Sequence, residues 1–344
     1  MKIVIFVTLF LPIFCTSILN AGNDAINLQY SKNSTELHAA NTDTNTNQNS
    51  AIIVKNTTLT NKDVCYKMRG GLGNQMFEFA TAYALAKRKG GQVFMDLSRF
   101  KTEKRTYALA IFNIPENFID IDSNPRDFYE HYGTDETVFT LTNLKSLLKT
   151  DKPVILEPLF MCPLYFNNVT DDLREMFTLK IPLSDNNQVW LNKIKSCEKS
   201  VSLHVRRSDY LDYKGVFSIC SIKYYKRAVN LIRKILGKDV TFFIFSEDID
   251  DAKKSLSWLK NAEFVPPDPK NSHEDMILMS NCKHNIIANS TYSWWGAWLN
   301  KNPDKIVIAP NYYFTRDLQA KINTIDWFDR EWIILNSNDD DVED

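Results

Sequence analysis

The sequence predicts an α/β protein with two Rossmann-like domains that face each other across a cleft. Short apolar strand patterns alternate with helical patterns over residues 63–335, and such alternation is typical of mostly parallel sheets. A glycine-rich turn joins the first strand to the first helix, as at the start of a doubly wound sheet. The chain has 344 residues, 44% of them hydrophobic, which is enough for the cores of two domains.

The first domain is predicted over residues 63–197. Its first strand runs into the glycine turn of residues 70–73, apolar residues then recur at helical spacing, and the glycines at 90–91 end the helix. The segment "QVFMDLS" is the next strand, which completes a strand–helix–strand unit. The remainder is less regular, with a strand pattern in "DKPVILEPLF" and two helical patterns ahead of residue 197.

The second domain is predicted over residues 198–335, and the acidic residues 336–344 are expected to form a disordered tail. Strands alternate with helices throughout this domain. Ser272 and Asp275 stand at capping-box spacing at the start of one of these helices. The strands are expected at residues 200–206, 240–246, 284–290 and 304–310.

The N-terminal residues 1–19 form an apolar run behind a single lysine. They fit a signal peptide cleaved near residues 17–21, or an uncleaved anchor that is slightly short and contains Pro12. Both interpretations place the chain in the secretory pathway. Residues 20–62 are rich in Asn and Thr and too poor in large apolar residues to fold alone, so they read as a luminal stem.

Asn-x-Thr sequons at Asn33, Asn56 and Asn168 are predicted glycosylation sites in that compartment. A fourth sequon at Asn289 follows a predicted buried strand, so we expect it to be unused. The six cysteines are widely spaced and show no zinc-binding pattern, although one or two disulfides are expected in an oxidising lumen.

The charge balance excludes some classes of partner. The formal net charge is −1 and the sequence pI is about 6.5, so nothing indicates binding to nucleic acid or to an anionic membrane surface. Any basic site must therefore be local.

Polar residues gather where three strands of the second domain are predicted to end. Ligands of open parallel sheets bind beyond the carboxyl ends of the strands. Arginine forks and a helix N-terminus would together suit a phosphate group. These residues are His204, Arg206, Arg207 and Asp209 after the first strand, Ser246 and Glu247 after the second, and Ser290 and Thr291 after the third.

Each cluster also has a structural interpretation. Alternation along the strand turns Arg206 and Arg207 to opposite sides, so one is expected to contact the ligand and the other to pair with an acid such as Asp209. The acidic turn after Ser246 and the hydroxyls before the later helix could serve as helix caps.

The first-domain loop "RGGLGNQ" does not match the dinucleotide fingerprint or the Walker pattern. Its glycines allow a tight turn and a close backbone approach. We expect Asn74 and Gln75 to offer neutral hydrogen bonds to a polyol on the acceptor side of the cleft.

Three segments resemble the signature blocks of glycosyltransferase family 11, the α-1,2-fucosyltransferases. They are "GGLGNQMFEFATAYALAKRKG", "HVRRSDYL" and "DMILMSNCKHNIIANSTYSWWGAWLN", and the resemblance covers about residues 64–330. It implies a GT-B-type fold with two Rossmann domains and a GDP-fucose donor. It further implies inverting transfer to the 2-hydroxyl of a galactose-like acceptor at the end of a glycan, with no metal and no other cofactor.

The resemblance also implies roles for individual residues. Arg206 would hold the donor diphosphate, with His204 near the guanine and Asp275 on it. Ser290 and Thr291 would contact phosphate. Ser246 and Glu247 would line the donor pocket. Ser208 departs from the family pattern, in which many members have glycine, and this puts the shape of that loop in doubt.

Some choices stay open on sequence alone. No metal-holding acidic motif stands in a strand-end loop, so arginine has to neutralise the departing GDP. Asp209 is the predicted base, with Asp212 and Glu247 as rivals.

The family resemblance and the apolar leader together predict a single-pass type II protein of the Golgi membrane with a luminal catalytic part; secretion is the alternative. A secreted carbohydrate-binding protein and a transferase for another nucleotide sugar are the competing functions.

Overall fold

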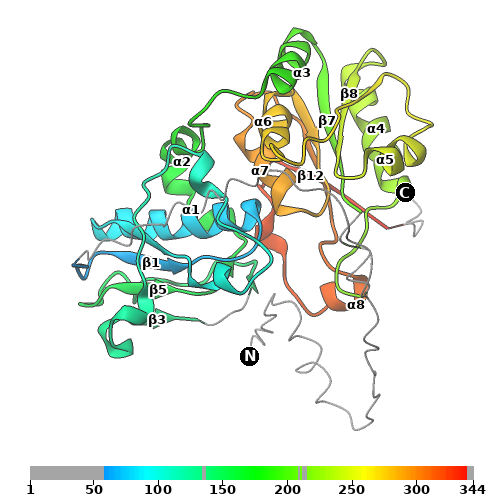
Figure 1. The fold of residues 1–344 in the computed structure, drawn as a ribbon. Coiled ribbons are helices and arrows are strands. Elements are labelled where there is room, and N and C mark those ends of the chain that lie inside the picture. Colours follow the sequence, from blue (N-terminus) through cyan, green and yellow to red (C-terminus); the bar gives the residue numbers. More distant parts are fainter. Residues whose placement is uncertain (1–57, 134–136, 208–209, 211–214, 339–344) are drawn as a thin grey trace, which may run out of the picture.

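The computed structural model describes residues 58–133, 137–207, 210 and 215–338. They form two parallel sheets with helices around them (Figure 1). The first sheet has strand order β2-β1-β5-β3 and the second has order β12-β11-β10-β7-β8-β9. Every neighbouring pair in both sheets is parallel, which confirms the predicted α/β class.

The strands of the first sheet come from the N-terminal half of the described chain. Strands β4 and β6 come from the same half of the chain and form a separate parallel pair. The bounds are β1 Val64–Lys67, β2 Val93–Asp96, β3 Glu130–Tyr132, β4 Thr137–Val138, β5 Val154–Leu156 and β6 Leu159–Phe160.

The second sheet takes its strands from the C-terminal half. Its strands β7 and β8 are buried along almost their whole length, as expected for a parallel sheet with helices on both faces. The bounds are β7 Ser200–Val205, β8 Thr241–Ser246, β9 Ala262–Phe264, β10 His284–Ile286, β11 Val307–Pro310 and β12 Ile333–Leu335.

The helices follow the predicted alternation. Helix α1 ends at Gly90, which adopts the left-handed conformation with φ of 71°, as its sequence position predicts. Helix α4 starts at Ser221, whose hydroxyl accepts a hydrogen bond from the Tyr224 N–H. The bounds are α1 Leu72–Lys89, α2 Thr170–Met176, α3 Asp185–Ser196, α4 Ile222–Leu236, α5 Ile249–Ser255, α6 Glu274–Asn281, α7 Thr291–Leu299 and α8 Arg316–Gln319.

Each sheet reverses its direction of growth beside its first strand. In the second sheet, β8 and β9 lie on one side of β7, and β10, β11 and β12 lie on the other. In the first sheet, β2 lies on one side of β1, and β5 and β3 lie on the other. Such reversal points open a crevice at the carboxyl ends of the strands, where ligands of α/β proteins bind.

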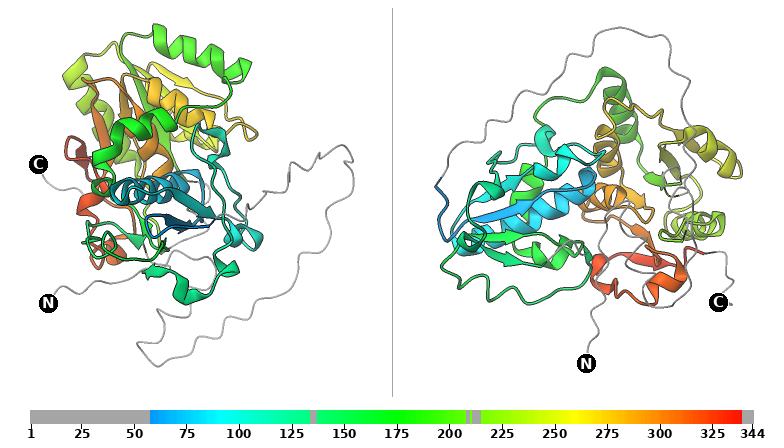
Figure 2. Two further views of the ribbon diagram at one scale, coloured as in Figure 1. Left: turned by 90° about the vertical axis from the view of Figure 1, so that its left-hand side faces the viewer. Right: turned by 60° about the horizontal axis from the view of Figure 1, so that its bottom comes forward.

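An aromatic junction joins the two sheets. Helix α1 of the first sheet packs on α7 of the second (Figures 1 and 2). The Phe77 ring lies 4.6 Å from the Trp294 ring and 5.0 Å from the Trp295 ring, centroid to centroid. The Trp295 indole N–H also donates to the Gly73 carbonyl at 2.9 Å. We call the packed side chains of α1 and α7 the aromatic junction; it puts the N-termini of these two helices next to each other.

The domain limits drawn from the sequence stay a prediction. Helix α3, which precedes the predicted limit at residue 197, packs on α6 of the second sheet. Asn187 on α3 donates to the Glu274 carboxylate at 2.7 Å. No helix within the described ranges is long and apolar enough to cross a membrane. The predicted anchor at residues 1–19 lies outside those ranges.

Two sequence expectations are wrong. The five cysteines within the described ranges are all free, so no disulfide links them. The residue before α6 is His273, which makes no capping bond, so the predicted Ser272–Asp275 capping box is absent. The Ser272 carbonyl instead accepts a hydrogen bond from the Tyr292 hydroxyl, which lies on α7.

Candidate active site

The three polar strand ends of the second sheet lie side by side, as predicted. Strand β7 pairs with β10 on one side and with β8 on the other, so their carboxyl ends meet at one edge. Arg206 follows β7, Glu247 follows β8, and Ser290 follows β10 just ahead of α7. The reversal point between β7 and β10 lies within this group, which makes it the natural ligand site of the sheet.

The two adjacent arginines diverge. Arg206 forms an ion pair with Glu247, and its guanidinium lies 5.4 Å from the centre of the Tyr210 ring. The Arg207 Nε lies 3.4 Å from the Asp251 carboxylate of α5. The two side chains therefore diverge as the strand alternation predicts, but both meet an acid, and which of them contacts a ligand stays a prediction. Asp209, the acid expected for this pairing and for the base, lies outside the described residues.

His204 is a neutral group within this cluster. Its side chain is buried, and burial lowers its pKa to about 3, with the positive charge of Arg206 adding to the effect. The Nδ1 atom has no hydrogen-bond partner among the residues that the structure describes. A neutral imidazole has one donor and one acceptor nitrogen, so His204 suits an uncharged polar ligand group and not a phosphate.

Asp275 is a buried carboxyl in the first turn of α6. Burial, together with the nearby negative charges of Asp268 and Glu274, raises its pKa to about 7. Its Oδ1 atom is buried and makes no hydrogen bond within the described part of the chain. A carboxyl in this state is poised to ionise when a ligand presents N–H donors to it.

Tyr292 contacts both the start of α6 and His204, and the sequence analysis did not identify it as a site residue. Its hydroxyl donates to the Ser272 carbonyl and accepts the N–H of Met276 at 2.8 Å, both beside Asp275. Its ring centre lies 6.0 Å from that of His204. The tyrosine stands in the first turn of α7, and its position directly behind the predicted phosphate-contacting hydroxyls is the signal that could have identified it.

The N-terminus of α7 is both a cap and a contact between the sheets. The Ser290 hydroxyl caps the helix by accepting the Tyr292 N–H at 3.3 Å. The Thr291 hydroxyl donates to the Asn74 side-chain carbonyl at 2.9 Å. In this structure its proton is therefore used by Asn74 and not by the predicted phosphate. A Cβ at Gly73 would lie 2.7 Å from Thr291, which explains why glycine stands there. Two helix N-termini thus converge here, and both favour an anion.

The predicted acceptor residue Gln75 is a structural residue. It is completely buried, and its amide donates to the Gly70 carbonyl at 2.8 Å and to the Thr106 carbonyl at 2.9 Å. Its side-chain carbonyl accepts the Ala108 N–H at 2.8 Å. These bonds use its polar atoms to shape the glycine loop, so the expected contact with a polyol is wrong for Gln75. Asn74 uses its carbonyl to join the two sheets.

The remaining predicted positions have definite surroundings. The Ser246 hydroxyl donates to the Asp248 carbonyl at 3.1 Å, and Asp248 caps α5, so this turn has the structural role that the sequence allowed. Asn168 is exposed, and its side chain accepts a hydrogen bond from Arg88 at 2.8 Å. Asn33 and Asn56 lie outside the described residues.

The sequon at Asn289 cannot accept a glycan in the folded protein. Asn289 is completely buried, and its amide donates to the carbonyls of Ser218 at 2.6 Å and Tyr313 at 2.9 Å. This agrees with the sequence expectation. The two bonds also fix the chain just ahead of Ser290.

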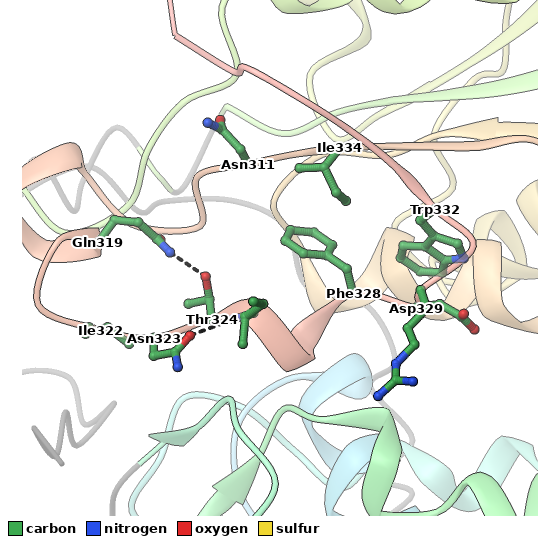
Figure 3. Close-up of a pocket in the computed structure, with 11 residues that line it drawn as sticks. Asn311, Gln319, Ile322, Asn323, Thr324, Phe328, Asp329, Trp332 and Ile334 are labelled. Atoms are coloured by element: carbon green, nitrogen blue, oxygen red, sulfur yellow. Dashed lines mark hydrogen bonds between the residues drawn. The ribbon is translucent and has the colours of Figure 1, made fainter. Parts of the chain in front are cut away.

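Among the residues that the structure describes, neither a metal cluster nor either of two surface hollows lies at this edge. Within the described ranges, no three His, Cys, Asp or Glu side chains gather as metal ligands. Two surface hollows, of about 470 Å³ and 630 Å³, are lined by other residues. The smaller lies among residues 311–334, where Gln319 bonds to Thr324 and aromatic side chains form one wall (Figure 3). The candidate site is therefore the strand edge itself.

Comparison with known proteins gives a consistent set of relatives. The sequence profile of Glycosyl transferase family 11 matches residues 32–336. The Escherichia coli O-antigen biosynthesis glycosyltransferase WbnK is 32% identical over 299 residues, covering 76% of this chain and 98% of the relative. An Escherichia coli alpha-1,2-colitosyltransferase is 30% identical over 294 residues, covering 78% of this chain and 98% of the relative.

More distant matches include animal enzymes and solved structures. The Rattus norvegicus galactoside alpha-(1,2)-fucosyltransferase 1 is 24% identical over 292 residues, covering 78% of this chain and 72% of the relative. The crystal structure of NodZ alpha-1,6-fucosyltransferase soaked with GDP-fucose has a TM-score of 0.43 and 14% identity. That match covers 69% of this chain and 92% of the other.

Proposed function

This chain belongs to glycosyl transferase family 11, and from that premise we propose that it is an inverting, metal-independent α-1,2-fucosyltransferase. It would move L-fucose from GDP-fucose to the 2-hydroxyl of a terminal galactose-like residue on a glycan. The observation that carries the proposal is the position of Arg206. It stands at the reversal point of the second sheet, and its charge acts on Tyr292 in the first turn of α7.

The chemistry follows from these charges. When the bond between fucose and GDP breaks, negative charge develops on the leaving diphosphate. The Arg206 guanidinium and the N–H groups of two helix N-termini are fixed positive partners for that charge. They are in place before the reaction begins, so they stabilise the transition state without reorganising.

The guanine would be read on the other side of the same edge. The buried Asp275 carboxyl can accept N–H donors of the base, and the neutral His204 offers an uncharged polar contact. The proton of the acceptor hydroxyl needs a receiving group on the face opposite the leaving diphosphate. We propose Asp209 for this role, since Glu247 is paired with Arg206.

A second candidate donor comes from the relatives. The alpha-1,2-colitosyltransferase is 30% identical to this chain, whereas the rat galactoside fucosyltransferase is 24% identical. A nucleotide sugar other than GDP-fucose is therefore the alternative substrate for the same site. For the cellular setting, we propose the Golgi membrane with a type II anchor at residues 1–19, on the apolar leader alone.

Product analysis tests the proposal. The full chain is incubated with GDP-fucose and a set of small galactosides, with and without a chelator, and the linkage of the product is determined by NMR. We expect α-1,2-linked fucose on galactose at equal rates in both conditions. A different linkage, or loss of activity with chelator, would contradict the mechanism. A parallel panel of GDP-linked and UDP-linked sugars identifies the preferred donor.

A further inference from the structure

The first sheet carries a second polar cluster at its own reversal point. Glu157 directly follows β5, and Arg99 lies in the short helix Ser98–Lys101 that follows β2. His131 lies on β3. The topology therefore brings charged side chains from three separated segments to the carboxyl end of β1 and β5, the position where an open sheet binds its ligand.

Glu157 is the centre of this cluster, and its carboxylate is only loosely held. The Arg99 Nη2 lies 3.4 Å from one carboxylate oxygen and the His131 Nδ1 lies 3.6 Å from the other. Both distances exceed the ordinary range for a strong hydrogen bond, and a carboxylate offers about four lone-pair positions. Glu157 is 23% exposed, so it keeps the capacity to accept further hydrogen bonds from a ligand.

A buried ion pair fixes the loop between β1 and α1. The Arg69 backbone N–H donates to the Glu78 carboxylate at 3.0 Å, and the Arg69 Nε lies 3.6 Å from the other oxygen. Both side chains are buried. The loop between β1 and α1 is thereby locked against the first turns of α1, which favours binding because little has to be ordered when a ligand arrives.

The cluster adjoins the donor edge through the glycine loop. The Gly70 N–H donates to the Glu103 carboxylate at 3.2 Å on the first-sheet side. Gly73, three residues later, touches Thr291 at the N-terminus of α7. Since an extended chain spans at most ~3.6 Å per residue, Gly70 and Gly73 are no more than about 11 Å apart. The glycine loop thus connects the Glu103 side of the first sheet to the N-terminus of α7.

The charges indicate which ligand chemistry fits. Glu157 and Glu103 would repel an anion, so a second phosphate site is disfavoured. A sugar hydroxyl, in contrast, can donate to a carboxylate and accept from a guanidinium at the same time. We propose that this edge binds hydroxyl groups of the acceptor glycan, with Glu157 as the principal acceptor of hydrogen bonds and Arg99 and His131 beside it. This inference rests on the proposed transferase function.

The Glu157→Gln variant of the full chain tests it. Gln keeps the size of the side chain but removes the charge, so we expect the KM for the acceptor to rise about tenfold. The KM for GDP-fucose, and the slow hydrolysis of GDP-fucose without acceptor, should change less than twofold. Acceptor binding measured by calorimetry with GDP present should weaken by the same factor as the KM.

Matched variants separate binding from structure. Glu116→Gln breaks another ion pair of the same half, with Lys180 at 3.0 Å, and should leave both KM values unchanged. His131→Gln should raise the acceptor KM by a smaller factor than Glu157→Gln. An unchanged acceptor KM in Glu157→Gln, or equal losses for donor and acceptor, would overturn the inference. If the wild-type chain binds galactosides but transfers no fucose, the proposed function fails, and calorimetry on Glu157→Gln still decides this site.

Discussion

The carboxyl edges of the two sheets have the same topology but are built from the sequence in different ways. Both sheets are parallel, and both reverse beside their first strand. The edge of the second sheet takes its polar groups from short contiguous segments, such as residues 204–207. The edge of the first sheet takes Arg99 from the short helix after β2, His131 from β3 and Glu157 from the segment after β5, which lie far apart in the sequence. Two sheet edges with the same topology are therefore not equally easy to recognise from the sequence.

The difference also extends to charge. The second edge has Arg206, which pairs with Glu247, and it lies at the N-terminus of α7; an arginine and a helix N-terminus suit an anionic diphosphate. The first edge mixes carboxylates with arginine, which suits hydroxyl groups. The comparison assigns the donor to one edge and the acceptor to the other. The following variants are chosen to break or refine that assignment.

The largest effect is expected for Arg206→Ala. Loss of one preorganised charge partner of the transition state should lower kcat by about 10²- to 10³-fold, while acceptor binding by calorimetry stays unchanged. Arg207→Ala is the matched control. It removes a contact to Asp251 and should lower kcat far less. Equal losses in the two variants would contradict the division of roles between the arginines.

Asp275→Asn should give the next largest effect. Losing a charged acceptor for guanine should raise the KM for GDP-fucose by about 10- to 100-fold without changing the acceptor KM. Burial raises the pKa of Asp275 to about 7, so the wild-type donor affinity should fall as pH drops below about 7, and the variant should lose that dependence. A wild-type donor affinity that is flat from pH 5 to pH 8 would refute this role.

The same carboxyl affects the stability of the unliganded protein with the opposite sign. Its folded pKa of about 7 lies above an unfolded value of about 3.9. The stability it contributes is therefore fully present below about pH 4 and is lost as pH rises through about 7. Bound GDP would reverse that trend by favouring the ionised form.

The smallest effect is expected for Thr291→Val. Thr291 lies on α7 and contacts Asn74 of α1, so it lies between the two edges. It removes the hydrogen bond to Asn74 without changing the shape of the side chain. We expect a loss of about 1 kcal/mol in the free energy of unfolding, measured by denaturant titration. The KM values of donor and acceptor should rise together by roughly twofold. Ser196→Ala, which removes a bond within α3 only, is the control and should change neither KM.

The sequence predicted the parallel α/β fold, most strands and helices of the second sheet, and the meeting of its three polar ends. These features depend on local periodicity and on polar residues placed directly after strands. The sequence could not predict the use of Gln75, because its partners Thr106 and Ala108 lie in an irregular loop. It also missed Tyr292, whose role depends on the separate position of α6.

The predicted acceptor contact of Gln75 failed for a related reason, whereas that of Asn74 stays a prediction. Asn74 and Gln75 are polar residues beside a glycine turn, a position that favours contact with a ligand. In the folded chain the Gln75 amide group instead bonds to Gly70, Thr106 and Ala108 within the first half, and the Asn74 carbonyl accepts the Thr291 hydroxyl. The polar groups at the first edge come from segments that are far apart in the sequence. They meet only when the sheet is complete.

The aromatic junction has a consequence for how the protein unfolds. One continuous apolar core runs from α1 of the first sheet into α7 of the second and includes Phe77, Trp294 and Trp295. Neither sheet can lose this core without exposing large rings of the other to water, at a cost of several kcal/mol. Melting should therefore be a single cooperative transition, so that one half does not persist as a folded fragment after the other has been lost.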